Sequence, residues 1–127
     1  MIVRLVSLKC KPEDVDAFRL LLHESSPRVR QFPGCLSLQI VNDITDPTSF
    51  FTLSTWRDTD ALEAYRTSPL FVEIWLRIKA FLREAAWAST CQEIEGQGVS
   101  QMCKDDGLSK QPSRGFLSRA DNKAEHE

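Results

Sequence analysis

The segment at residues 50–81 constrains the fold most, because within it a strand pattern changes into a helix pattern at one polar turn. Along residues 50–57 the side chains alternate, with Phe51 and Leu53 on one face and Phe50, Thr52, Ser54 and Trp56 on the other. A period of two is typical of a strand, whereas the apolar spacing that follows is typical of a helix. Asp58 can accept early backbone N–H groups, and Ser68-Pro69 has the sequence of a second helix start. We therefore predict a strand followed by a helix in two pieces.

Three further strand patterns and one further helix pattern accompany this segment. The strands are expected at residues 2–9, 35–41 and 85–94, and the helix from Pro12 to about residue 32. Pro27 should bend or end that helix, because proline lacks a backbone donor and crowds the preceding turn. The order strand, helix, strand, strand, helix, strand predicts an α+β fold of the ferredoxin-like βαββαβ type. In this fold one antiparallel sheet carries both helices on one face.

Apolar residues occupy both faces of the predicted strands. In the first strand Ile2, Val6 and Leu8 share a face with Arg4, while Val3 and Leu5 lie on the other. The helices can cover only one face, and covering several hundred Å² of the other at ~25 cal/mol per Å² contributes on the order of 10 kcal/mol before association costs. We therefore predict a homodimer in which two sheets pack face to face. Arg4 would either hold an anionic substrate or pair with a carboxylate at the dimer seam.

Composition bears on two questions: which kinds of partner the chain binds, and in which cellular compartment it lies. The chain has 127 residues and a net charge of -2, which fits one domain and gives no electrostatic reason to expect nucleic acid or an anionic membrane as a partner. No apolar run approaches the ~20 residues of a membrane span, and the first residues lack the pattern of a signal peptide. A cytoplasmic location is therefore expected. The four cysteines form no CxxC pair and have no zinc-like spacing, which favours free thiols over a disulfide scaffold and predicts no metal site.

The composition changes after Glu95, where four of the five glycines of the chain follow. The segment is polar, mixed in charge and without periodicity, so it cannot bury enough apolar surface to offset the entropy of ordering. We expect a folded domain at residues 1–95 and a flexible tail at residues 96–127. The alternative is a segment that folds onto a partner or across a pocket through its few apolar residues.

Three stretches of the chain resemble one known family. They are KPEDVDAF, FPGCLSLQIVND and FFTLSTWRDTDALEAYRTSPLF, and the similarity runs from residue 1 to about residue 94. A strand ending in Trp, a polar turn, Ala-Leu-x-Ala-aromatic and then Ser-Pro-x-Phe is similar to the antibiotic biosynthesis monooxygenase (ABM) domain of the dimeric α+β barrel superfamily. The resemblance implies a homodimer that binds a small hydrophobic or aromatic substrate.

The resemblance also implies a monooxygenase that oxidises an aromatic or quinol-like molecule with O₂ and needs no bound cofactor. In such an enzyme the substrate loses a proton and its anion passes an electron to O₂, while the protein supplies a dry pocket, orientation and one proton acceptor. Haem-degrading relatives carry an Asn, an aromatic residue and an iron-binding His at three positions. Here those positions are Ser7, Tyr65 and Trp75, so iron ligation is not expected.

Six residues are candidates for the site. His23 and Tyr65 are the candidate catalytic residues, either of them as proton acceptor, and Tyr65 could instead donate a hydrogen bond to a substrate oxygen. The candidate substrate-binding residues are Ser7, Trp56, Phe71 and Trp75. Each has a structural alternative, because the Trp residues can simply fill the core, Tyr65 can pack on the sheet and His23 can be a half-exposed helix residue. Two further functions use the same scaffold: a dimeric module that binds a ligand without turnover, and an isomerase.

Overall fold

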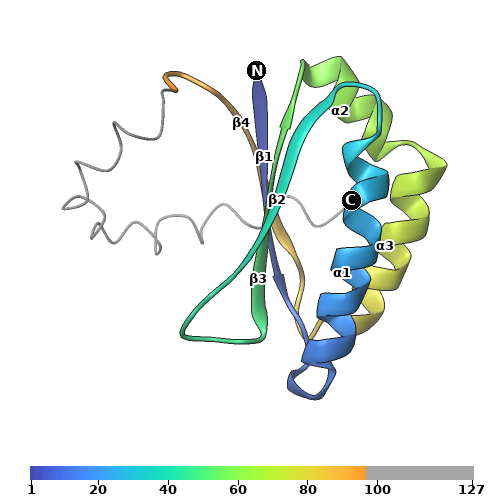
Figure 1. The fold of residues 1–127 in the computed structure, drawn as a ribbon, viewed down its shortest axis with the longest axis vertical. Helices are drawn as coiled ribbons and strands as arrows, with labels where there is room; N and C mark the ends of the chain where they lie inside the picture. Colours follow the sequence, from blue (N-terminus) through green and yellow to red (C-terminus); the bar gives the residue numbers. More distant parts are fainter. Residues whose placement is uncertain (97–127) are drawn as a thin grey trace.

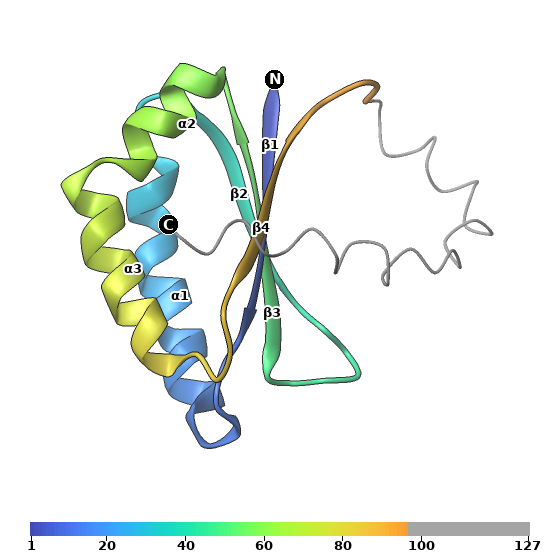
Figure 2. The same cartoon turned by 180° about the vertical axis from the view of Figure 1, so that it is seen from behind.

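Figure 1 shows a computed structural model of the chain, which describes residues 1–96. The elements follow the predicted order and are β1 (Ile2–Lys9), a 3₁₀ turn (Pro12–Asp14), α1 (Val15–Arg30), β2 (Cys35–Asn42), β3 (Ser49–Trp56), α2 (Thr59–Arg66), α3 (Pro69–Phe81) and β4 (Trp87–Gln92). The strands form one antiparallel sheet in the order β2-β3-β1-β4. All the helices lie on one face of this sheet, as both views show (Figures 1 and 2). This confirms the α+β, ferredoxin-like prediction.

The register of the sheet assigns every strand residue to one of two faces. Val6 pairs with Thr52 and with Ala88, and this row lies on the helix side. Ser7 pairs with Phe51 and with Trp87, so that row lies on the opposite side, because successive side chains of a strand point to opposite faces. The even-numbered residues of β1 and β3 therefore face the helices, and the residues that share a face are those that the alternation predicts.

Helix α1 continues through Pro27 and ends at Arg30. Proline cannot donate to the carbonyl of His23 four residues earlier. The Ser26 hydroxyl lies 3.4 Å from that carbonyl oxygen and donates to it instead, and the Ser25 hydroxyl donates to the Leu21 carbonyl at 2.8 Å. The Ser26 hydroxyl thus replaces the one backbone bond that Pro27 cannot make, and the helix continues beyond Pro27 to Arg30, two residues short of the predicted end.

The second helical segment divides where the sequence predicts. The Asp58 carboxylate accepts the Ala61 N–H at 2.8 Å and caps α2, and the Ser68 hydroxyl accepts the Phe71 N–H at 3.1 Å and caps α3. Pro69 occupies the first turn of α3, where no backbone donor is required. The break between α2 and α3 turns the apolar side of α3 back over the sheet.

The core lies between the sheet and the helices. Its fully buried side chains are Leu8, Cys10, Phe18, Phe50 and Trp56. The rings of Phe18 and Phe50 meet edge to face at 5.2 Å, an arrangement that adds ~0.5–1.5 kcal/mol beyond area burial. These contacts join α1 to the centre of the sheet and hold the layers together.

Two details differ from the predicted strands. A shift of register between Cys35 and Ser37 leaves Leu36 exposed, although the alternation placed it with Leu38 and Ile40 on one face. Strand β4 is shorter than residues 85–94. The predicted tail at residues 96–127 lies outside the described residues, apart from Gly96.

Among the described residues, no helix has the length and apolar character that crossing a bilayer requires. The cytoplasmic location stays a prediction.

Gly34 joins α1 to β2 with a positive φ of 91°, and its carbonyl accepts the Arg57 N–H at 2.9 Å. A Cβ added here would collide with the Cβ of Ala61. We expect Gly34→Ala to lower the free energy of unfolding in urea by about 1–3 kcal/mol, because a side chain is strained in this backbone region. Gln31→Ala, at an exposed position of the same connection, should stay within ~0.5 kcal/mol of wild type. Equal effects of the two substitutions would show that Gly34 is not required by its backbone conformation.

Candidate functional site

A cavity of about 110 Å³ lies between the sheet and the helices. Its floor is formed by helix-facing residues of all four strands, among them Val6, Ile40 and Thr52, and its roof by α1 and α3 together with Tyr65 of α2. Most of the lining is apolar, which limits the access of water and strengthens any charge interaction inside. The volume is somewhat smaller than the ~150 Å³ of an engineered cavity that binds benzene. The hollow is therefore suited to a single ring.

Arg4 brings a positive charge to the floor of this cavity. It belongs to the helix-facing row of β1, next to Val6 and Leu8, and its Nη1 donates to the Thr90 hydroxyl of β4 at 2.7 Å. A guanidinium has five donors in a planar fork that matches a carboxylate or an anionic oxygen. The bond to Thr90 holds the guanidinium in place at the floor of the cavity.

A series of aromatic rings runs along one side of the cavity. Phe32 contacts both Trp56 and Tyr65, Trp56 stacks on Tyr65 at 5.0 Å, and Tyr65 meets Phe71 edge to face at 5.2 Å. Phe71 in turn stacks on Trp75 at 6.2 Å with an interplanar angle of 11°. Each ring fixes the next, so the flat walls available to a ligand are held in place before it binds.

Tyr65 is the polar member of this series. Burial is the main cause that raises the pKa of its hydroxyl to about 12, a nearby Cys35 thiol raises it further, and the charge of Arg4 partly opposes the shift. At neutral pH the phenol therefore stays protonated. Its hydroxyl is suited to donate a hydrogen bond to a ligand oxygen, and the raised pKa disfavours the role of proton acceptor.

The remaining polar groups of the lining are hydroxyls. Ser25 donates to a backbone carbonyl, and the Ser54 hydroxyl accepts the Trp56 indole N–H at 2.9 Å. Within the part of the chain that the structure describes, no carboxylate and no imidazole lines the cavity. Residues 1–96 also contain no group of three or more His, Cys, Asp or Glu side chains arranged to hold a metal ion.

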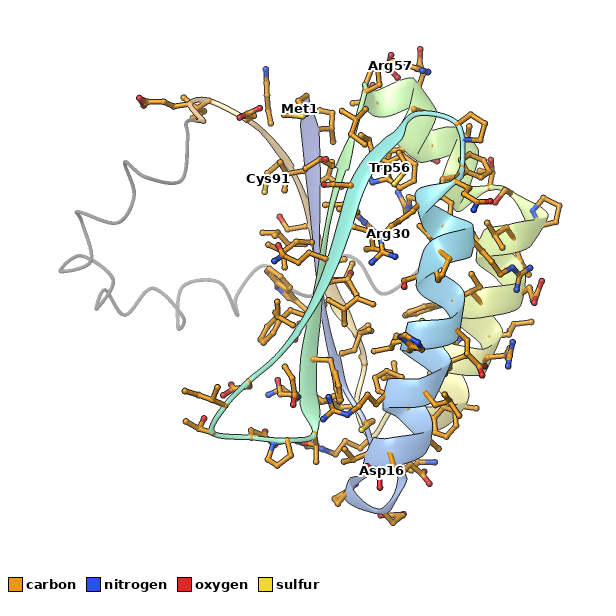
Figure 3. The ribbon with its side chains drawn as sticks, in the orientation of Figure 1. Met1, Asp16, Arg30, Trp56, Arg57 and Cys91 are labelled. Carbon is orange, nitrogen blue, oxygen red and sulfur yellow. The ribbon has the colours of Figure 1, made fainter. Side chains whose placement is uncertain are left out.

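The structure brings three of the six candidate residues together at the cavity. Tyr65, Phe71 and Trp75 line it. Trp56 is 1% exposed, stacks on Tyr65 and has its indole N–H satisfied by Ser54, so it supports the wall from the core. Figure 3 shows Trp56 between the sheet and the helices.

The other two candidates lie elsewhere. Ser7 is on the opposite face of the sheet, because it shares the row of Phe51 and Trp87. His23 is exposed and lines a separate groove between α1 and β2. Arg4, which is not among the six candidates, lines the cavity. The sequence indicated this position, because Arg4 is two residues from Val6 and four from Leu8 and therefore shares their face of the strand.

Tyr65 is the only tyrosine of the chain, so its ionisation can be followed without interference. We expect the tyrosinate absorbance to rise with a midpoint near pH 12 in the native protein, and near pH 10 after unfolding in urea. Because the native state binds this proton more tightly than the unfolded state, native stability should fall as pH rises above 10. Tyr65→Phe should show a smaller loss of stability across this interval. A native midpoint near pH 10 would contradict the buried position of the hydroxyl.

Comparisons with known proteins agree with this architecture. The family model described as "Antibiotic biosynthesis monooxygenase" (ABM) matches residues 1–74. A solved structure described as an antibiotic biosynthesis monooxygenase is 25% identical, with a TM-score of 0.70 over 75% of this chain and 100% of the other. SnoaB of Streptomyces nogalater, described as a cofactor-independent oxygenase, is 12% identical, with a TM-score of 0.68 over 75% of this chain and 94% of the other, a likeness of fold alone.

One curated relative is an uncharacterized protein of Synechocystis sp., which is 32% identical over 67 residues. The match covers 53% of this chain and 46% of that protein, so the chain spans about half the length of this relative. The match to the family model extends over more than half of the 127 residues, and the described fold is shared with its solved structures. This chain therefore belongs to the antibiotic biosynthesis monooxygenase family.

Proposed function

We propose that this protein binds a phenol or quinol of one ring in its cavity, as the anion, and oxidises it with O₂ without a bound cofactor. The observation that carries the proposal is the Arg4 guanidinium on the floor of a mostly apolar hollow, whose lining also includes the protonated Tyr65 hydroxyl. A positive charge in a dry site lowers the pKa of a phenol bound next to it. The family and the likeness to a cofactor-independent oxygenase support the choice of O₂ as oxidant.

The residues of the cavity divide the work as follows. Phe71 and Trp75 position the ring, Arg4 stabilises the phenolate oxygen, and Tyr65 donates a hydrogen bond to a second oxygen of the substrate. The anion then passes an electron to O₂, which bonds to a ring carbon after recombination. For a quinol the products are a hydroxyquinone and water: one oxygen atom enters the ring, the other becomes water, and the quinol supplies all four electrons. No external reductant is required.

The proton leaves the substrate without a dedicated protein base in this scheme. The lining within residues 1–96 offers hydroxyls but no carboxylate or imidazole, so the proton passes to water at the cavity opening once Arg4 has lowered the substrate pKa. The same composition of the lining favours a second candidate function, a ligand-binding module without turnover. Consumption of oxygen by the bound ligand distinguishes the two, and turnover without it would indicate an isomerase.

We also propose that the protein is a homodimer whose sheets pack face to face. The sheet face opposite the helices carries Val3, Leu5, Phe51, Leu53 and Trp87. Figure 2 shows that no helix covers this face within the described part of the chain. Cys91 marks the same side in Figure 3, where it points away from the helices. Packing two such faces together would bury the apolar rows and stiffen the floor of each cavity.

An oxygen electrode and a panel of phenols and quinols test the proposed reaction. We expect uptake with at least one quinol and a loss of about 10–100-fold in kcat/KM for Arg4→Gln, the size of an effect from one hydrogen bond to a charged group. Arg4→Lys should retain part of the activity, because the charge remains while the planar fork is lost. Arg77→Gln removes an exposed charge on α3 and should behave as wild type. Uptake that is unaffected in Arg4→Gln would remove the residue on which the proposal depends.

Light scattering at micromolar concentration tests the assembly. Wild type should have twice the mass of the chain, and Leu53→Asp should shift it to the mass of a monomer, because a carboxylate buried at the interface without a partner is costly. Leu76→Asp, which changes a leucine on the outer side of α3 that is 61% exposed, should remain dimeric. A monomeric wild type would contradict the packing of sheet on sheet, and circular dichroism would confirm that both variants are folded.

A further inference from the structure

The cavity extends to the sheet edge that β4 forms, beneath α3. Helix α1 packs on β2 at the opposite edge, and α3 packs beside α1, so α3 spans the half of the sheet that contains β4. Ala86 and Ala88 line the cavity from the β4 side, and Phe71 and Trp75 line it from α3. Among residues 1–96, no further strand pairs with the outer side of β4.

The side chains of the floor become smaller toward this edge. One row across the sheet runs from β2 to β4 in the order Ile40, Thr52, Val6 and Ala88. On the α3 side, Trp75 is partly exposed, whereas Ile74 on the same helix is buried. A low floor that ends in a methyl group, under a roof residue that reaches solvent, places the mouth of the cavity between Trp75 and Ala88.

An exposed apolar strip continues from this mouth along α3. Val72 is 50% exposed and Leu76 is 61% exposed, and neither lines the cavity. Val72 is three residues before Trp75 and four before Leu76, so the three side chains are neighbours on the helix surface. The opposite flank of α3 faces α1, where Glu73 pairs with Arg28 at 2.9 Å. We call Val72, Trp75 and Leu76 the α3 strip.

The size of the cavity determines where a substituent on a bound ring would go. About 110 Å³ is suited to a single ring, since an engineered cavity of ~150 Å³ holds benzene. The inner walls are closed by buried side chains, among them Leu8, Leu22 and Ile78. A substituent of several carbons therefore has to leave through the mouth, where it passes Ala88 and meets the α3 strip. Covering the strip with an alkyl chain removes apolar surface of both from water, which is favourable.

We propose that the α3 strip binds an alkyl substituent of the molecule whose ring occupies the cavity, so that the substrate class is an alkyl-substituted phenol or quinol. This inference rests on the proposed function for the place of the ring. Trp75 belongs to both parts of the site, because it lines the cavity and adjoins Val72 and Leu76. Ala88 sets the width of the mouth. The exposed pair on α3 thereby acquires a role in substrate selection.

Binding measured without oxygen tests the strip apart from the reaction. Hydroquinone, ethylhydroquinone, butylhydroquinone and hexylhydroquinone share one ring and differ only in chain length, and calorimetry under nitrogen gives their affinities for the full chain. We expect the affinity of wild type to rise about twofold per added CH₂, roughly half, in free energy, of the effect of complete burial. A chain that stays in water would leave the affinity independent of its length.

Substitutions on the helix surface locate the bound chain. Val72→Ser and Leu76→Ser should each lower the affinity for hexylhydroquinone about fivefold and leave that for hydroquinone unchanged, because they remove apolar surface outside the cavity. Leu20→Ser is the matched control, a leucine on α1 that is 54% exposed, and it should leave both affinities unchanged. Ala88→Val narrows the mouth and should weaken hexylhydroquinone more than hydroquinone. Circular dichroism checks that the variants are folded.

Three results would overturn the inference: equal affinities of hydroquinone and hexylhydroquinone for wild type, an undiminished effect of chain length in both strip variants, or an equal loss in Leu20→Ser. A change of mass in light scattering with Val72→Ser or Leu76→Ser would also count against it, because the strip would then be covered by a second copy of the chain.

Oxygen uptake with the same probes keeps the two proposals distinct. If affinity rises with chain length but no oxygen is consumed, the oxygenase proposal fails and the strip stands. If hydroquinone is oxidised and the alkyl chain gives no gain in affinity, the strip proposal fails and the oxygenase stands.

Discussion

The alternation of side chains along the strands determines which residues line the cavity and which form the outer face of the sheet. It places Arg4, Val6 and Leu8 under the helices and Leu5 on the opposite face with its partner Leu53. A shift of one residue in β1 would exchange the faces and put Arg4 outside and Leu5 into the core. The buried contacts of Phe18 with Phe50 and of Trp56 with Tyr65 hold the register in place, because each joins a helix to one strand position. The cavity, its charge and the apolar outer face are therefore consequences of one alignment.

The continuation of α1 through Pro27 has a similar consequence for the groove between α1 and β2. Had the helix ended at the proline, Arg30 would not lie on the helix edge that carries Arg19 and His23. Ser26, whose hydroxyl bonds to the carbonyl that Pro27 cannot reach, also lines both the cavity and this groove. Local repair of the helix and the boundary between cavity and groove thus depend on the same side chain.

Sequence patterns predicted the fold almost completely, and the site only in part. Alternation, the Asp58 and Ser68 caps and the order of elements are local signals, so they could be read before any tertiary contact was known. The position of Ser7 depends on which face of β1 the helices cover, and the position of His23 depends on which edge of α1 faces β2. A family resemblance does not predict either feature to the precision of a single residue. The continuation of α1 past Pro27 could not be predicted either, because it depends on the Ser26 hydroxyl lying within reach of the carbonyl that Pro27 leaves without a donor.

The chemistry of the cavity follows from charge and protonation taken together. A guanidinium in an apolar hollow stabilises an anion, and a phenol with a pKa of about 12 can donate a hydrogen bond but does not take a proton at neutral pH. The site can therefore hold a substrate that is already acidic, or made acidic by Arg4, and it is poorly suited to remove a proton from a weak carbon acid. This asymmetry favours phenols and quinols over neutral ketones. In the proposed reaction, activity therefore depends on the positive charge of Arg4 and not on a basic side chain that removes a proton.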